Sequence, residues 1–151
     1  MADTKEIDTR LGWQVVALDK VIHFPRGIIG FENHKDFTLL QIRPEAPFLV
    51  LQSIDDPGLG LLVADPYGFL PDYLVKLGDA EQKLLQITTR EELAVLVTVA
   101  IPPGRPEETV ISLTGPILIN HAAKIGLQVP QTELRGPTKL SLNTADLTPI
   151  Q

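Results

Sequence analysis

The sequence predicts an all-β single domain, either a barrel or a sandwich. Roughly nine short apolar runs, many of them β-branched, are separated by turns, and only one segment has a helical period. Thirteen prolines and eleven glycines in 151 residues interrupt the chain too often for long helices. One domain is expected at this length, and a hydrophobic content of 44% is enough for a core.

The first half of the chain is expected to form strands at residues 13–17, 21–24, 37–42, 48–53 and 59–64. Residues 1–10 are polar, mixed in charge and without periodicity, so we expect a flexible N-terminus there. The last two of these strands are joined by residues 54–58, where Asp55, Asp56 and Gly58 supply turn chemistry. The sequence therefore predicts a hairpin at this point.

One segment, near residues 71–86, breaks the strand pattern. Its apolar residues recur at steps of four, three and four: Tyr73, Leu77, Ala80 and Leu84. Gly78 suits the end of one helical turn, and Asp79 suits the N-cap of the next, with Gln82 three residues later. We therefore expect two short helical turns.

The second half of the chain begins with residues 93–101, which are nearly all apolar and rich in β-branched side chains. The Pro-Pro-Gly stop after this run favours a strand buried on both faces. Further strands are expected at residues 110–113, 116–120 and 125–129, with a loose strand at 138–142. The domain should span residues 11–142, followed by a disordered tail at 143–151.

Composition and charge limit the functional classes. The chain has no cysteine, which excludes disulfides and suits a reducing cytosol, and no apolar leader follows Met1. The net charge is −6, and residues 44–110 hold eleven acidic and four basic side chains. Such a surface repels phosphate and attracts basic partners, so direct nucleic-acid binding is not expected. Simple solubility is the alternative explanation of this charge.

The residue types of enzyme active sites are present, but not at catalytic spacing. The serines and histidines form neither a nucleophile elbow nor a metal-binding pair, and no phosphate-binding glycine loop occurs. Three carboxylate pairs occur, at 55–56, 91–92 and 107–108, but neighbours on an extended chain point to opposite faces. Solvated turns explain them better than catalysis does. No enzyme activity, cofactor or metal is expected.

Residues 65–73 combine three aromatic residues and two prolines with carboxylates, which is the composition of a protein-contact surface. An alternative is that Phe69 and Tyr73 anchor the helical segment to the core, an interpretation that we favour for Tyr73. Turn capping could likewise account for Asp65, Asp72 and Asp79. The predicted partner-binding residues are Asp55, Asp56, Asp65, Phe69, Asp72, Tyr73 and Asp79.

Residues 24–32 form a predicted corner between strands. Pro25, Gly27 and Gly30 permit the bend, and an aromatic residue at each end, Phe24 and Phe31, gives the bend something to bury. Further motifs follow at 47–53, 65–66, 115–120 and 126–129. The structural motif residues are Phe24, Pro25, Gly27, Gly30, Phe31, Pro47, Phe48, Gln52, Pro66, Pro116, Asn120 and Gln128.

This ordered set of motifs, from about residue 21 to residue 129, resembles the FliW family of flagellar assembly factors. The resemblance implies a compact antiparallel β-barrel-like fold and a cytoplasmic protein. We also expect a protein that is neither an enzyme nor membrane-bound, and that is monomeric when alone. The resemblance also implies two partners, the translational repressor CsrA, a small RNA-binding dimer that the protein antagonises, and newly made flagellin. Flagellin translation would thereby follow flagellum assembly.

Two alternatives to this function remain open. The first is a small β-barrel ligand-binding protein or enzyme, with a pocket beneath residues 24–31; a polar-lined pocket would favour it. The second is a chaperone that binds flagellin alone and has lost the CsrA branch.

Overall fold

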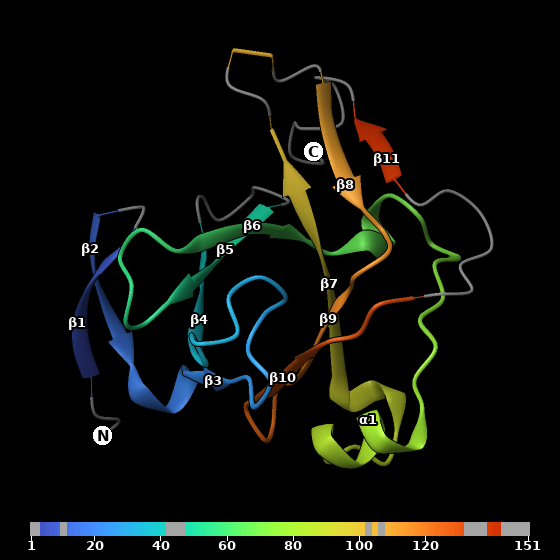
Figure 1. The fold of residues 1–151 in the computed structure, drawn as a ribbon, viewed down its shortest axis with the longest axis horizontal. Helices are drawn as coiled ribbons and strands as arrows, with labels where there is room; N and C mark the ends of the chain where they lie inside the picture. Colours follow the sequence, from blue (N-terminus) through green and yellow to red (C-terminus); the bar gives the residue numbers. More distant parts are fainter. Residues whose placement is uncertain are drawn as a thin grey trace.

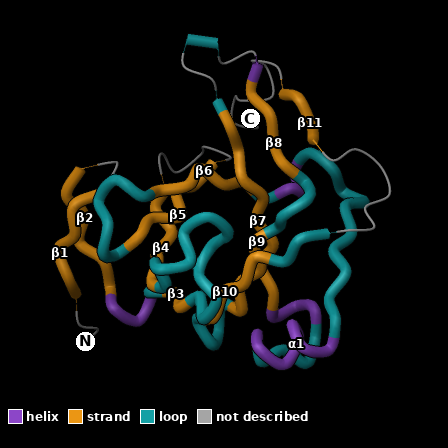
Figure 2. Tube along the Cα trace, viewed as in Figure 1, coloured by secondary structure: helices purple, strands orange, loops and turns teal. Residues whose placement is uncertain are grey.

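The computed structural model describes residues 4–9, 12–41, 48–101, 104–105, 108–131 and 139–142. Within this part of the chain the all-β prediction is confirmed, and the helical structure consists of α1 (Asp79–Leu85) and short 3-10 turns (Figure 2). Pro47 and the predicted tail at 143–151 lie outside the described residues. The labelled 3-10 turns are η1 (Leu18–Lys20), η2 (Pro66–Gly68) and η3 (Arg90–Glu92), and Glu108 before β8 also has 3-10 conformation.

The strands follow the predicted runs closely, with one addition at the N-terminus. They are β1 (Thr4–Thr9), β2 (Gly12–Ala17), β3 (Ile22–His23), β4 (Asp36–Gln41), β5 (Phe48–Ser53), β6 (Gly60–Ala64), β7 (Leu93–Ala100), β8 (Thr109–Ser112), β9 (Ile117–Asn120), β10 (Ile125–Gln128) and β11 (Lys139–Leu142). The predicted hairpin is formed by β5 and β6, which pair from Phe48–Ala64 to Gln52–Gly60.

β9 closes the main sheet into a barrel-like ring, because it pairs antiparallel with both β10 and β7. The ring runs from β3 through β4, β5, β6, β7 and β9 to β10 and back to β3 (Figure 1). β8 and β11 extend the sheet beyond β7. One pairing departs from the expected antiparallel arrangement, since β3 and β10 are parallel, with His23 opposite Ile125. A parallel pair needs a crossover, which the intervening strands provide.

The N-terminus contains a strand where we expect a flexible segment. β1 pairs with β2 from Thr4–Ala17 to Thr9–Gly12, in a two-stranded sheet separate from the nine-stranded one. Ile7 is buried, and the Thr9 hydroxyl donates to the Gly12 carbonyl at 2.7 Å. The polar composition was misleading because a hairpin with only one buried face needs few apolar residues.

β7 is buried on both faces, as its sequence predicts. Leu96 belongs to one cluster of buried apolar residues, with Phe24, Phe37 and Leu51, whereas the next residue, Val97, belongs to a second cluster. β9 behaves in the same way, since Ile117 and Leu118 lie in different clusters. Successive side chains of a strand point to opposite faces, so the two clusters cover the two faces of the sheet.

The segment before α1 is extended rather than helical, which corrects half of the helical prediction. Tyr73 and Val75 are buried and Leu77 is half-buried, whereas Leu74 and Lys76 are exposed. This alternation has the period of two of an extended chain. The cap is also corrected: α1 has Gly78 as its N-cap, with no side-chain capping bond, and Asp79 is its first helical residue.

The corner at residues 24–32 forms, but only one of its aromatic residues is buried. The Gly27 amide donates to the Phe24 carbonyl at 2.9 Å, and Gly27 has a φ of +66°. A Cβ at Gly27 would lie 2.6 Å from the Glu32 Cα, so glycine is needed for both conformation and space. Phe24 is 0% exposed, whereas Phe31 is 41% exposed.

Two amide side chains among the motif residues hold turns together. The buried Gln52 amide nitrogen donates to the carbonyls inside its own hairpin loop: Ser53 (3.1 Å), Asp56 (3.1 Å) and Pro57 (3.4 Å). Gln128 connects two distant loops, because it accepts from the Ile29 amide at 3.0 Å and donates to the Gly115 carbonyl at 3.0 Å.

The carboxylate of Glu92 organises the entry into β7. Its Oε1 accepts from the Thr88 amide at 2.9 Å, the Thr89 amide at 2.9 Å and the Thr88 hydroxyl at 2.8 Å. These hydrogen bonds, the Thr88 amide first, lower the pKa of Glu92 to about 2 from its ordinary 4.5.

Replacing Glu92 with glutamine is expected to flatten the acid dependence of stability. The folded-state pKa is lowered, so the carboxylate stabilises the fold above about pH 4.5 and loses that contribution as the pH falls toward 2. Urea unfolding at several pH values between 2 and 6 measures the effect, with the exposed neighbour Glu91→Gln as the control. An unchanged pH profile for Glu92→Gln would contradict the assignment.

Candidate functional site

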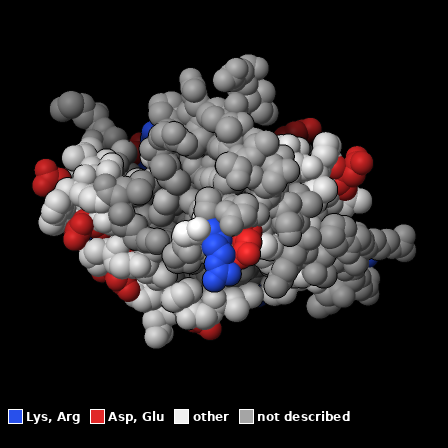
Figure 3. Space-filling view, turned by 90° about the horizontal axis from the view of Figure 1, so that it is seen from above, with Lys and Arg blue, Asp and Glu red and all other residues white. Residues whose placement is uncertain are grey.

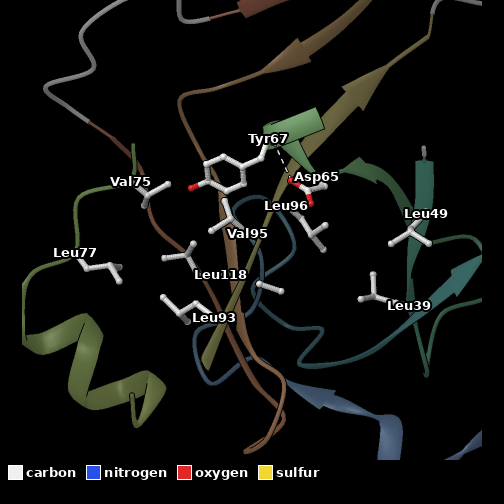
Figure 4. A pocket seen from close by; sticks show the side chains of 11 residues that line it. Leu39, Leu49, Asp65, Tyr67, Val75, Leu77, Leu93, Val95, Leu96 and Leu118 are labelled. Atoms are coloured by element: carbon white, nitrogen blue, oxygen red, sulfur yellow. Dashed lines mark hydrogen bonds between the residues drawn. The ribbon is translucent and has the colours of Figure 1, made fainter. Parts of the chain in front are cut away.

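An apolar groove of about 430 Å³ crosses β7 and is the candidate site (Figure 4). It is lined by side chains from β4, β5, β7 and β9 and from residues 65–77, between β6 and α1: Leu39, Leu49, Asp65, Tyr67, Val75, Leu77, Leu93, Ala94, Val95, Leu96 and Leu118. Nine of these eleven side chains are aliphatic, which suits an apolar ligand surface.

The groove lies where the two apolar clusters meet. In Figure 4, Leu39, Leu49 and Leu96 lie on one side of it, and Val75, Leu77 and Leu118 lie on the other. Four consecutive residues of β7, from Leu93 to Leu96, contribute to the lining. Both faces of this strand therefore contribute to the groove.

The rim of the groove carries Asp65 and Tyr67. Asp65 caps η2, because its Oδ1 accepts a hydrogen bond from the Tyr67 amide at 2.8 Å. The Tyr67 ring is tilted against the Tyr73 ring, with 6.2 Å between their centroids. The rim thus presents an exposed aromatic ring next to an exposed carboxylate.

Tyr73 supports the rim from the core. Its side chain is 7% exposed, and its hydroxyl donates to the Leu113 carbonyl at 2.6 Å. Burial, and then the neighbouring Tyr67, raise the pKa of Tyr73 to about 12. Tyr73 therefore anchors its segment to the core, which is the interpretation that we favour for this residue. Little of its surface remains for contact with a partner.

A two-way amide contact holds the extended segment in place. The Lys76 amide donates to Gln131 Oε1 at 2.8 Å, and Gln131 Nε2 donates back to the Lys76 carbonyl at 3.2 Å. Val75 and Leu77, on either side of Lys76, are thereby directed into the groove.

The seven predicted partner-binding residues do not form one patch. Residues 65–73, the stretch that contains η2, hold four of them: Asp65, Phe69, Asp72 and Tyr73. In this stretch Phe69 packs against the core and Asp72 is exposed. Asp55 and Asp56 lie in the loop at the opposite end of β6, a strand that spans about 17 Å. Asp79 begins α1 and is exposed. Partner binding by these residues stays a prediction.

Several groove residues were not singled out from the sequence. Val75 and Leu77 were assigned to a helix, although the alternation from Tyr73 to Leu77 could have identified an extended segment with one buried face. The contributions of Leu39, Leu49 and Leu118 had no local signal. Each belongs to a different strand, and only closure of the barrel brings them to the same groove.

The hollow at residues 24–31 differs from the pocket expected by the ligand-binding alternative. An open hollow of about 390 Å³ is lined by Gly30, Phe31, Glu32, Asn33 and His34, so it involves only the C-terminal end of the corner. In the described part of the chain, no three His, Asp or Glu residues come together as a group that could hold a metal ion. Within the same residues, none of the helices has the length and apolar character needed to cross a membrane.

Comparison with known proteins identifies the family. The sequence profile described as "FliW protein" matches residues 5–142. A flagellar assembly factor FliW from Nitratidesulfovibrio vulgaris (strain DP4) is 63% identical over 141 residues, which cover 93% of this chain and 82% of the relative. Another, from Desulfovibrio desulfuricans, is 55% identical over 92% of this chain and 84% of the relative.

A solved structure supports the same conclusion. The crystal structure of a flagellar assembly factor FliW superimposes with a TM-score of 0.84 and 32% sequence identity, over 91% of this chain and 96% of that chain. The resemblance seen in the ordered motifs is thus confirmed by sequence and by fold. The chain belongs to the FliW family of flagellar assembly factors.

Proposed function

We propose that this flagellar assembly factor binds and antagonises the translational repressor CsrA, and that it also binds flagellin. It does so as a cytoplasmic monomer with a chaperone-like role and without catalysis. The observation that carries the proposal is the apolar groove with an aromatic and acidic rim. It offers apolar area to an unassembled subunit beside a negative surface that attracts a cationic repressor.

The acidic character of the surface supports a cationic partner. The exposed carboxylates between residues 48 and 101 outnumber the exposed lysines, and include Asp55, Asp65, Asp72, Asp79 and Glu91, against Lys76 and Lys83. Arg105 is paired with Glu108 at 3.4 Å. In the view from above, acidic groups of described residues are spread around the edge of the molecule, with few basic ones (Figure 3). Such a field speeds encounter with a basic protein and weakens with salt.

The groove supports an apolar partner segment. Its lining presents aliphatic side chains from Leu93 to Leu96 of β7 and from Val75 and Leu77 of the extended segment. A segment of flagellin that becomes buried only on assembly would expose apolar side chains before secretion. Docking that segment in the groove would remove it from water and would make flagellin and CsrA compete functionally for this protein.

Calorimetric titration with CsrA of the same organism, repeated after saturation with flagellin, tests the proposal. We expect CsrA to bind, and prior flagellin binding to abolish the heat. Binding of flagellin alone would support the chaperone without a CsrA branch, and no heat with either protein would overturn the proposal.

The same titration with the double variant Asp65→Lys/Asp72→Lys tests the electrostatic contribution. Reversing two exposed charges should weaken CsrA binding more at 50 mM than at 500 mM salt, because screening removes interactions between exposed charges. Equal effects at both salt concentrations would exclude the electrostatic explanation.

A further inference from the structure

The outward face of the β1–β2 hairpin presents a large aromatic side chain beside two carboxylates. Trp13 is 73% exposed and Val15 is 65% exposed. The pairing register places Asp8 opposite Trp13 and Glu6 opposite Val15. Directly paired residues have their side chains on the same face, with Cβ atoms about 4.5–5.5 Å apart. These four residues, Glu6, Asp8, Trp13 and Val15, therefore form one patch, which we call the hairpin face.

The other face of the hairpin is the one that is covered. Ile7, Thr9 and Val16 alternate along the strands with the residues of the hairpin face, and all three are buried. This packing orients the hairpin at one edge of the molecule, far from α1 (Figure 1). Trp13 and Val15 contribute nothing to that packing, because strand geometry points them away from it.

The chemistry of the hairpin face selects a cationic partner. Within the described strands its outward positions carry two carboxylates and no basic residue, because Lys5, opposite Val16, lies on the other face. A tryptophan ring attracts arginine and lysine through its π face, and neighbouring carboxylates strengthen the contact. Tryptophan is also enriched among the residues that contribute most to protein interfaces.

We infer that the hairpin face is the docking surface for the basic, RNA-binding repressor of the proposed function, with Trp13 as its anchor. The inference rests on the proposed function and assigns its cationic partner to a defined surface. Arginine or lysine side chains of the repressor stack on Trp13 and pair with Asp8 and Glu6. The groove at η2 is the surface proposed for the apolar partner, so the exclusion of CsrA by flagellin acts across the domain and not by overlap of the two surfaces.

Trp13 is the one tryptophan of the sequence, which makes it a specific probe. In the full chain labelled with 5-fluorotryptophan, a single ¹⁹F resonance should report this position. Unlabelled CsrA adds no signal, so a change of the resonance on saturation measures contact at Trp13. We expect the resonance to shift and broaden with CsrA, and to stay unchanged with flagellin alone.

Substitutions in the hairpin face measure how much its side chains contribute to the affinity for CsrA. Trp13→Ala should weaken CsrA binding about 30-fold, as expected for an interface anchor, with an unchanged thermal midpoint because the side chain is exposed. Leu74→Ala is the matched control, because Leu74 is also 73% exposed but lies in the segment beside the groove. Asp8→Asn should weaken binding mainly at low salt and keeps the shape of the hairpin face.

The outcomes separate the inference from the proposed function. If calorimetry gives CsrA binding that Trp13→Ala leaves intact, or if the ¹⁹F resonance does not respond, the hairpin face is not the docking surface and the proposed function stands. If Leu74→Ala weakens binding and Trp13→Ala does not, the repressor binds at the groove instead. If CsrA does not bind at all, the proposed function fails and the inference fails with it.

Discussion

Replacing Phe24 with alanine is expected to lower the free energy of unfolding by about 3–5 kcal/mol, the range for a fully buried aromatic residue. The ring is 0% exposed and packs edge-on against Phe37, with 5.4 Å between the ring centroids. It also covers Gly126 of β10, so it joins the corner to the strand that helps close the barrel. Urea unfolding followed by circular dichroism measures the loss.

The contact between Phe24 and Gly126 can be tested by combining substitutions at the two positions. A Cβ at Gly126 would lie 2.4 Å from Cε2 and Cζ of the Phe24 ring. Gly126→Ala alone should therefore cost about 1–3 kcal/mol through overpacking of a ring that has no room to move. In the Phe24→Ala background the added methyl group enters the vacated space, so its cost should largely disappear. Additive effects of the two changes would contradict the contact, because only neighbouring residues couple in this way.

Replacing Asn120 with alanine is expected to lower the free energy of unfolding by about 3 kcal/mol, because buried polar groups lose their partners. Asn120 is 2% exposed. Its amide nitrogen donates to the Leu85 carbonyl at 2.8 Å, and its oxygen accepts from the Ala122 and Ala123 amides at 3.1 Å each. One side chain thus connects the end of α1 to the turn between β9 and β10.

The position of these partners predicts where the damage appears. Hydrogen exchange at the C-terminal end of α1 should accelerate in Asn120→Ala, because Leu85 and Gln86 lose their contact with β9. Asn33→Ala, in an exposed turn, is the matched control and should change stability by less than about 0.5 kcal/mol. A loss for Asn120→Ala as small as that of the control would show that the turn does not depend on the buried amide.

Strand positions were predictable because their causes are local. β5 and β6 each have a short apolar run, and the residues between them are turn formers. β7 was recognised as buried on both faces from composition alone, and the two clusters bear this out. β1 was missed because its stability comes from pairing with β2 and from one buried apolar residue, Ile7, rather than from its own composition.

The prediction of two helical turns near residues 71–86 was half right, and the reason is again physical. The spacing from Tyr73 to Leu84 fits a helix, but Tyr73, Val75 and Leu77 fit an extended chain as well. The Tyr73 hydroxyl bond to Leu113 and the Gln131 contact with Lys76 favour the extended form, and both partners are distant in sequence. Tertiary contacts therefore decided between two locally acceptable conformations.

The sequence by itself determined the fold class, the order of the strands, the turn chemistry and the family, because each depends on residue type and short spacing. Only the tertiary structure decided how the sheet closes and which side chains meet at the groove. Those contacts join strands far apart along the chain, such as β4 with its Leu39 and β9 with its Leu118. The same holds for the hairpin face, where the register of β1 on β2 places Asp8 beside Trp13. The pairing register and the closure of the ring depend on several strands at once, so the sequence of any single segment does not determine them.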